Sequence, residues 1–150
     1  MKGIYLSFGS NIGDRELHIK NAAGRLSSVG KILRTTPLAE TDPVDYINQN
    51  KFLNCVSEFE YEGPPSQLLA EIKKIEREMG RIKTINKGPR NIDIDILLFG
   101  KTIISTDYLV IPHASLKNRI FFLEMLTSLS PDITDPASGI PYREYLNETK

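Results

Sequence analysis

Two aspartates separated by one residue, Asp93 and Asp95, interrupt an apolar stretch over residues 92–99. On a β-strand, residues two apart share a face, so the two carboxylates would project together with their Cα atoms roughly 6.5 Å apart. This spacing would let them hold a pair of metal ions about 3.5–4 Å apart, and hard oxygen ligands suit Mg²⁺. The alternative is an amphipathic strand that presents both carboxylates to water. The opposite face of the strand would carry Ile92, Ile94, Ile96 and Leu98.

Basic residues surround this pair in the sequence. They precede it in a loop that ends at residue 90, and they follow it after His113. Phosphoryl transfer depends on positioning and on neutralisation of charge by metal ions and by Arg or Lys, so this arrangement suits a triphosphate. A solvated basic loop is the alternative. The basic residues are Arg81, Lys83, Lys87, Arg90, Lys117 and Arg119.

A polar residue within a second apolar run is a candidate for binding another ligand. Asn54 lies inside residues 52–56, where a buried amide without partners would cost about 1–3 kcal/mol. Phe52 shares its strand face, which would place a stacking ring beside an amide able to read the edge of a flat heterocycle. Equally, Asn54 could tie down the backbone of a neighbouring loop.

His113 and Glu76 each allow more than one role. His113 follows Pro112 and precedes an expected helix, so it could donate a hydrogen bond to a phosphate or cap that helix. Glu76 borders the apolar stripe of another expected helix and precedes Arg81 by five residues, which favours a structural ion pair.

Elements that would position these residues can be predicted from periodicity. Patterns of apolar and polar residues predict strands over residues 4–8, 31–36, 52–59 and 92–99, the first of them ending in a turn at Gly9-Ser10-Asn11. Two amphipathic helices fall between them. Asp14 would cap the first, whose apolar stripe includes Leu17, and Gly30 would close it. The second would start within residues 63–66 and end before Gly80.

The remaining segments are less regular. Residues 39–50 are polar and contain Pro43, so we expect a long loop. Residues 101–104 would pair back onto the strand over residues 92–99. Ser115 would cap a third helix, and prolines would break up the tail that follows it.

The order β-α-β-β-α-β resembles a ferredoxin-like α+β sandwich. In this fold, helices pack on one face of a mainly antiparallel sheet; here an extra C-terminal helix and long loops would be added. Because the fold hosts many functions, it does not decide the function by itself.

Composition narrows the class of protein. A chain of 150 residues with 40% hydrophobic content suits one domain over residues 1–150. Nineteen Lys and Arg balance nineteen Asp and Glu, so we expect no nucleic-acid or membrane partner. The single cysteine, Cys55, and the absence of a signal-like or membrane-spanning run predict a soluble protein of the cytoplasm.

Several motifs together resemble the 6-hydroxymethyl-7,8-dihydropterin pyrophosphokinase family of folate biosynthesis. They occur in the family's order over nearly the whole chain, and the segment from Gly88 to Asp95 with the later His and Arg is the most specific part. The motifs are Gly9-Ser10-Asn11, Phe52-Leu53-Asn54, Gly88-Pro89-Arg90 with Asp93 and Asp95, and Pro112-His113 with Lys117-Asn118-Arg119.

The resemblance implies transfer of a pyrophosphoryl group from ATP to the hydroxymethyl oxygen of the pterin, by attack on the β-phosphorus, with release of AMP. It implies two Mg²⁺ ions on Asp93 and Asp95 and phosphate contacts from Arg81 and Arg90. The implied nucleotide contacts are Glu76, Lys83, His113 and Arg119. The implied pterin pocket comprises Gly9, Thr35, Thr36, Pro37, Leu38, Phe52, Asn54 and Phe121.

Three positions depart from the family pattern. Lys83 stands where some members carry Arg, Lys87 where some carry Trp, and Ala114 where a Tyr often follows the His. A Lys is a flexible point charge rather than a planar fork, so phosphate recognition and loop closure would differ.

Two other functions remain as alternatives. A non-catalytic ligand-binding domain would use Asp93 and Asp95 only as surface carboxylates. A two-metal phosphohydrolase would release phosphate or pyrophosphate from ATP without the pterin. An RNA-binding role is least favoured, because no strand shows clustered aromatic side chains. For the kinase we expect two small-molecule substrates and a monomer.

Overall fold

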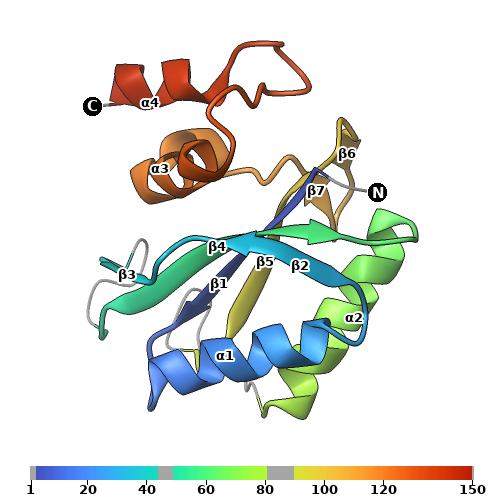
Figure 1. Cartoon of the computed structure of the whole chain (residues 1–150), viewed down its shortest axis with the longest axis vertical. Helices are drawn as coiled ribbons and strands as arrows, with labels where there is room; N and C mark the ends of the chain where they lie inside the picture. Colours follow the sequence, from blue (N-terminus) through green and yellow to red (C-terminus); the bar gives the residue numbers. More distant parts are fainter. Residues whose placement is uncertain (1–2, 44–48, 81–89, 150) are drawn as a thin grey trace.

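The computed structural model describes residues 3–43, 49–80 and 90–149. A five-stranded antiparallel sheet lies between two helical layers (Figure 1). Four of its strands follow the order β2-β4-β1-β5, and β3 pairs with β4 beside β2. This order is that of the predicted ferredoxin-like fold. The strands are β1 (Ile4–Ser10), β2 (Lys31–Thr35), β3 (Ala39–Thr41), β4 (Phe52–Glu60) and β5 (Asp93–Phe99).

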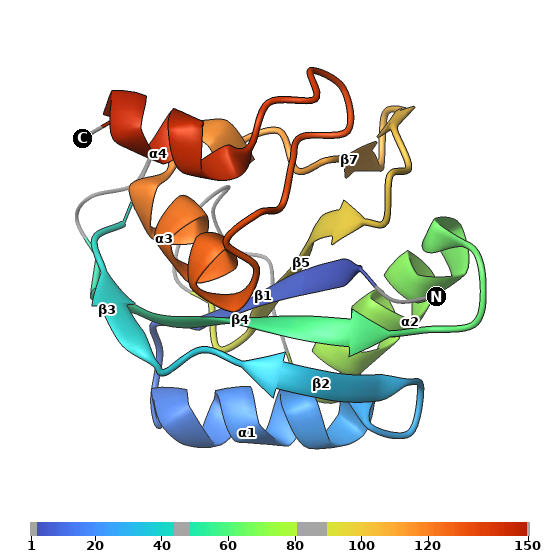
Figure 2. The ribbon, with the colours of Figure 1, turned by 45° about the horizontal axis from the view of Figure 1, so that its top comes forward.

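Helices cover both faces of the sheet. Figure 2 shows α1 and α2 on one side of it, and α3 with α4 on the other. The first pair are the two predicted amphipathic helices, α3 is the predicted third helix, and α4 follows it in sequence. Their bounds are α1 (Arg15–Leu26), α2 (Pro65–Glu78), α3 (Ile120–Leu129) and α4 (Tyr142–Thr149).

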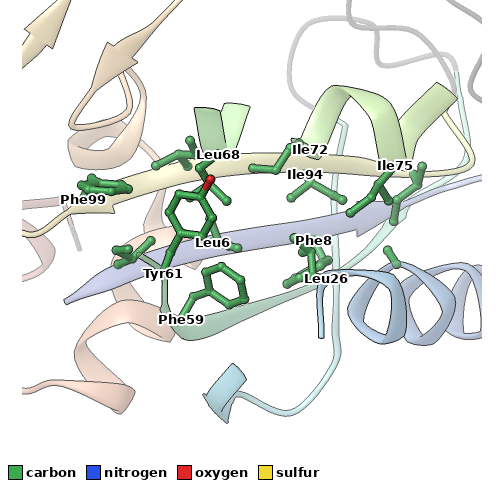
Figure 3. Packing of buried hydrophobic residues seen from close by; sticks show 14 of the residues in the cluster. Leu6, Phe8, Leu26, Phe59, Tyr61, Leu68, Ile72, Ile75, Ile94 and Phe99 are labelled. Atoms are coloured by element: carbon green, nitrogen blue, oxygen red, sulfur yellow. The ribbon is translucent and has the colours of Figure 1, made fainter. Parts of the chain in front are cut away.

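Each face of the sheet has its own apolar cluster, as two covered faces require. The cluster under α1 and α2 includes the central side chains of β1 and the stripes of both helices (Figure 3). The cluster under α3 and α4 includes Val56, Leu97 and Tyr142. Strand β1 is buried along its whole length because it lies in the middle of the sheet with helices on either side.

The helix ends follow from local sequence, with one error in the predicted stripe. The Asp14 carboxylate accepts a hydrogen bond from Leu17 N at 3.1 Å and so caps α1, as predicted. Gly80, at φ 78°, follows the end of α2 in the left-handed conformation that glycine tolerates. Leu17, expected in the apolar stripe, is 58% exposed because its position on α1 faces solvent.

A β-bulge corrects the predicted faces of β5. In the pairing of β1 with β5, Leu6 lies opposite Ile96 and Tyr5 lies opposite Leu98. Leu97 is therefore an extra residue on β5 that has no partner on β1. Ile94 and Ile96 pack under α1 and α2 as expected, but Leu98 packs with Leu97 in the other cluster. Asp93 and Asp95 precede the bulge, so they keep the shared face that alternation predicts.

Two irregular regions differ from prediction because tertiary pairing decides them. Residues 39–50 are not wholly a loop, since Ala39 and Thr41 pair with Asn54 and Phe52 of β4. Residues 101–104 do not pair back onto β5. The chain turns at Gly100, with φ 57°, and β6 (Ile104–Ser105) pairs instead with β7 (Val110–Ile111).

The C-terminal third also differs. Ser115 makes no side-chain capping bond in the structure; it precedes a 3₁₀ turn, η1 (Leu116–Asn118), and α3 begins only after Arg119. The tail is not broken up throughout, because α4 forms directly after Pro141, at a position where a missing N–H costs a helix nothing. Among the helices described, none is long and apolar enough to cross a membrane.

Two leucines of α1 provide a test of this burial. Leu26 is fully buried and Leu17 is largely exposed on the same helix. We expect Leu26→Ala to lower the free energy of unfolding by about 2–5 kcal/mol, through lost burial and a residual cavity. Leu17→Ala should change it by less than about 0.5 kcal/mol. Urea unfolding measures both; equal losses would contradict the described packing.

Candidate functional site

The paired aspartates lie at the start of β5, the edge strand next to β1. Asp93 stands opposite Gly9, and Asp95 stands opposite Ser7. The Arg90 guanidinium lies 3.2 Å from Asp93 Oδ2, and His113 Nε2 lies 3.9 Å from Asp95 Oδ1. The structure therefore brings one predicted phosphate-binding residue and one predicted nucleotide-binding residue beside the carboxylate pair.

A third carboxylate, Glu76 of α2, supports the pair from the neighbouring layer. It is 3% exposed, and its Oε2 accepts a hydrogen bond of 3.0 Å from the backbone N–H of Ile94, the residue between the aspartates. Because β5 is an edge strand, an amide that points away from β1 has no strand partner, and Glu76 provides one. Lys73 lies 3.4 Å from Glu76 Oε1. The predicted partner, Arg81, lies outside the described residues.

The carboxylates of Asp93, Asp95 and Glu76 lie close enough together to influence one another's charge. Burial raises the pKa of Asp95 well above its usual range, and the nearby Asp93 and Glu76 carboxylates raise it further, with Lys73 opposing them. A site that penalises an unpaired carboxylate in this way favours a proton or a cation.

The donor set fits magnesium rather than a soft metal. Mg²⁺ in proteins takes one or two carboxylates and completes its octahedron with water and substrate phosphates. Asp93 and Asp95 could supply two such oxygen ligands, and no cluster of three or more His, Cys, Asp or Glu side chains that could hold a metal occurs within the described residues. Substrate oxygens would therefore have to complete the coordination shell.

Hydrogen bonds hold both the backbone and the ring of His113. Its N–H donates to Leu97 O at 2.9 Å, and its Nδ1 accepts from Ser115 N at 3.0 Å. The neutral ring therefore carries its proton on Nε2, the atom that faces Asp95. The ring packs edge-on against Phe122 at 5.5 Å. Of the two predicted roles, the structure shows His113 capping the turn through Nδ1 while Nε2 stays directed at the carboxylates.

The other predicted cations divide into three groups. The Arg119 guanidinium lies over the Phe122 ring, 5.5 Å from its centroid. Lys117 does not join the site, because its ammonium pairs with Asp135 at 2.8 Å. The three cations of the preceding loop, Arg81, Lys83 and Lys87, lie outside the described residues, as do Gly88 and Pro89 of the motif that follows them.

The predicted acceptor residues lie across β1 from the aspartates. Asn54 pairs with Gly9, and a Cβ built at Gly9 would lie 2.8 Å from Asn54 Oδ1 and 3.5 Å from the Phe52 ring. Glycine is therefore the residue that leaves room for both side chains. Asn54 is 8% exposed and donates a short hydrogen bond to Thr41 Oγ1. The Arg90 guanidinium lies 5.2 Å from the centroid of the Phe52 ring, so Arg90 contacts both halves of the site.

A cavity of about 360 Å³ lies between α3 and the chain leaving β2. Its lining includes four predicted pterin-pocket residues, Thr36, Pro37, Leu38 and Phe121. Phe52 and Asn54 are not part of this lining. Both contact Thr41, which lines the cavity: Phe52 pairs with it across the sheet, and Asn54 donates a hydrogen bond to its hydroxyl. Thr35 faces elsewhere, with its hydroxyl 2.8 Å from that of Ser57.

Asn11 is a central residue whose geometry sequence reasoning missed. It is 1% exposed, and its Oδ1 accepts from Arg90 N at 2.8 Å. Its amide nitrogen donates to Gln49 Oε1 at 2.7 Å and to Asn50 O at 3.1 Å. One side chain thus joins the end of the basic loop to the segment before β4. The only sequence signal was its place in the Gly9-Ser10-Asn11 motif, of which Gly9 and Ser10 belong to β1 rather than to a turn.

Comparison with known proteins identifies relatives of this chain. Residues 5–131 match the family model described as 7,8-dihydro-6-hydroxymethylpterin-pyrophosphokinase, HPPK. The folic acid synthesis protein fol1 of Schizosaccharomyces pombe is 44% identical over 146 residues, which cover 96% of this chain and 20% of that protein. The chain thus spans about a fifth of this fungal relative's length.

A bacterial relative and a solved structure extend the comparison. The 2-amino-4-hydroxy-6-hydroxymethyldihydropteridine pyrophosphokinase of Aquifex aeolicus is 37% identical over 148 residues, covering 99% of this chain and 92% of that protein. The crystal structure of wild-type Plasmodium falciparum HPPK-DHPS with pteroate superposes with a TM-score of 0.75 at 20% identity, covering 97% of this chain and 42% of that chain. This likeness shows a shared fold.

The raised pKa of Asp95 predicts a pH-dependent effect on stability. In the unfolded chain this carboxyl ionises near pH 3.8, whereas the fold disfavours its charged form. The wild-type protein without metal therefore loses stability as pH rises from about 4 toward the raised pKa. Asp95→Asn removes that loss, so its gain in unfolding free energy over wild type should grow between pH 4.5 and pH 8.

Urea unfolding in EDTA at both pH values measures this difference. Asp132→Asn is the matched control, because its side chain is 96% exposed. A gain from Asp95→Asn that stays constant or shrinks with rising pH would contradict the electrostatic account.

Proposed function

Because the chain belongs to the 7,8-dihydro-6-hydroxymethylpterin-pyrophosphokinase family, we propose that it transfers a pyrophosphoryl group from ATP to 6-hydroxymethyl-7,8-dihydropterin. The hydroxymethyl oxygen forms a bond to the β-phosphorus of ATP. The bond from that phosphorus to the oxygen bridging the α-phosphate breaks, AMP leaves with that oxygen, and the hydroxyl proton passes to solvent. The observation that carries the proposal is the placement of Arg90 between the carboxylate pair and the Phe52 ring.

The metal part of the proposal rests on Asp93 and Asp95. Their oxygens would hold two Mg²⁺ ions, with ATP phosphates and water completing the ligands. Bound Mg²⁺ neutralises phosphate charge and aligns the reacting oxygens. Glu76 keeps the two aspartates in place through the Ile94 amide, since a fixed strand backbone fixes the direction of both side chains.

The nucleotide part uses cationic and donor groups around the pair. His113 Nε2–H would donate to a phosphate oxygen, and the Arg119 and Arg90 guanidinium groups would each offer a planar fork of donors. Arg90 currently pairs with Asp93, and a phosphate would compete for it. Arg81 and Lys83 belong to the same proposal by the family resemblance, although they lie outside the described residues.

The acceptor part combines Asn54 with two aromatic side chains. Phe52 and Phe121 would cover the two faces of the pterin, and the Asn54 amide would read its edge, exchanging its bond with Thr41 for bonds to the ligand. Thr36, Pro37 and Leu38 would form the wall, and Thr35 would contribute only its backbone, because its hydroxyl faces Ser57. Gly9 would keep the floor open, as its close approach to Asn54 indicates.

The proposal also covers the partners, the oligomeric state and the cellular location of the enzyme. Its partners would be ATP and the pterin alone, and it would act as a monomer in the cytoplasm. Balanced charge supports the absence of a nucleic-acid partner, and a single, buried, unpaired Cys55 suits a reducing compartment.

Incubation with Mg-ATP and 6-hydroxymethyl-7,8-dihydropterin tests the proposal. We expect one AMP for each pyrophosphorylated pterin, measured by chromatography, and no AMP without the pterin. Asp93→Ala and Asp95→Ala should each lower kcat by about 10²–10³-fold, since each removes charge stabilisation at the reacting phosphates. Asp132→Ala, at an exposed carboxylate, should keep wild-type turnover.

Two results would overturn it. A folded protein that produces no AMP under these conditions excludes the kinase. Release of phosphate or pyrophosphate from ATP without the pterin would indicate a two-metal phosphohydrolase instead.

Gly9→Ala tests the acceptor half separately. The added methyl group would displace the Asn54 amide and the Phe52 ring, so the KM for the pterin should rise about tenfold or more, while the KM for ATP stays within about twofold. Steady-state kinetics measure both. Gly24→Ala is the matched control, because a Cβ there meets nothing within 4 Å. An equal rise in both KM values would contradict the assignment.

A further inference from the structure

The C-terminal segment, residues 132–149, encloses a buried carboxylate. The family model ends at residue 131, so this segment lies beyond the matched stretch. Asp135 is 1% exposed, and its carboxylate accepts hydrogen bonds from Ser138 N and from Tyr142 Oη, both at 3.1 Å. Its backbone N–H donates to Ile140 O at 2.9 Å. These bonds close a compact turn ahead of α4.

The ionic partner of this carboxylate comes from outside the segment. Lys117 Nζ lies 2.8 Å from Asp135 Oδ2 and 4.8 Å from the centroid of the Tyr145 ring. Burial opposes ionisation of Asp135, but the Lys117 ammonium and the bonds from Ser138 and Tyr142 outweigh it and hold the pKa of Asp135 at about 2. The pair is therefore charged at neutral pH.

Lys117 lies in η1, the short turn between two residues of the nucleotide site. His113 precedes this turn and Arg119 follows it directly. Within the turn, Leu116 N donates to His113 O at 3.0 Å, and Ser115 N donates to His113 Nδ1 at 3.0 Å. A movement of η1 would therefore alter both the His113 ring and the Arg119 backbone.

The C-terminal segment holds η1 in two ways. The side chain of Lys117 is tied to Asp135, and the neighbouring Leu116 is buried in the same apolar cluster as Tyr142. A 3₁₀ turn of three residues has little stability of its own, because its hydrogen bonds have poor geometry. Its position is thus set by what packs against it.

We propose that Asp135 is a positioning residue for nucleotide binding: through Lys117 it fixes η1, and with it the His113 ring beside Asp95 and the start of α3 at Arg119. This inference rests on the proposed role of those two residues in binding ATP. An ion pair with only one buried partner contributes little net stability compared with apolar packing, so geometric specificity is the consequence to test.

The test compares substitutions on both sides of the ion pair. Asp135→Asn keeps the size of the side chain, and Lys117→Met keeps an unbranched apolar chain while removing the ammonium that lies over the Tyr145 ring. We expect each to weaken binding of a non-hydrolysable ATP analogue with Mg²⁺ by about tenfold, measured by calorimetry. The KM for the pterin should stay within about twofold. Asp132→Asn, in the exposed pair with Arg143 of the same segment, should change neither value.

The split between the two substrates separates positioning from a purely structural role. General loosening of the protein would raise both the nucleotide dissociation constant and the KM for the pterin, and that result overturns the inference. Lys117 is 41% exposed, so Lys117→Met remains informative if Asp135→Asn does not fold.

Two further variants show whether a negative result overturns this inference or the proposed function itself. His113→Ala and Arg119→Ala should weaken binding of the ATP analogue directly. If they do so while Lys117→Met and Asp135→Asn retain wild-type affinity, only the positioning inference is overturned. If His113→Ala and Arg119→Ala also retain wild-type affinity, the proposed nucleotide site itself is wrong.

Discussion

The hydrogen bond from the Ile94 amide to the Glu76 carboxylate joins the main parts of this structure. It supplies a partner to an edge-strand amide, docks α2 against β5, and fixes the backbone on which both aspartates stand. It also places a buried negative charge beside them. Lys73 lies on the opposite side of Glu76 and offsets this charge only in part. The same contact that orders the strand therefore adds negative charge beside the two aspartates, which favours a bound cation.

A second set of contacts joins the halves of the site across β1. Arg90 pairs with Asp93 and covers the Phe52 ring, and Asn11 holds the Arg90 backbone through hydrogen bonds in both directions. Because Asn11 also donates hydrogen bonds to Gln49 and Asn50, one buried side chain connects the segment before β4 with the backbone of Arg90. In the proposed reaction this would link the acceptor pocket to the phosphate-binding residues.

Sequence reasoning succeeded where local rules decide the structure. Period-2 alternation predicted β5 and the common face of Asp93 and Asp95, and capping chemistry predicted the start of α1 at Asp14. It failed where a distant partner decides. The bulge that turns Leu98 to the other layer depends on β1, and the short strand β3 exists because β4 offers it an edge.

The site shows the same division. A polar residue in an apolar run drew attention to Asn54, but nothing in the chain near Asn11 indicates partners 38 to 79 residues away. Lys117 was grouped with the cations that suit a triphosphate because it follows His113 in the sequence together with Arg119. Its actual partner follows 18 residues later, in a segment whose prolines concealed a helix.

The balance of charge over the whole chain bears on how such a site works. Equal numbers of acidic and basic residues provide no long-range attraction for a polyanion such as ATP, so capture must come from groups at short range. At short range, geometry decides the energy, because a guanidinium fork or a histidine N–H contributes fully only when it is aimed at the phosphate. Fixing the turn between His113 and Arg119 would therefore strengthen the contacts of both residues with a bound phosphate. A buried Asp135 paired with Lys117 fixes it from outside the sheet, where the α3 and α4 layer has no other ionic contact with η1 among the described residues.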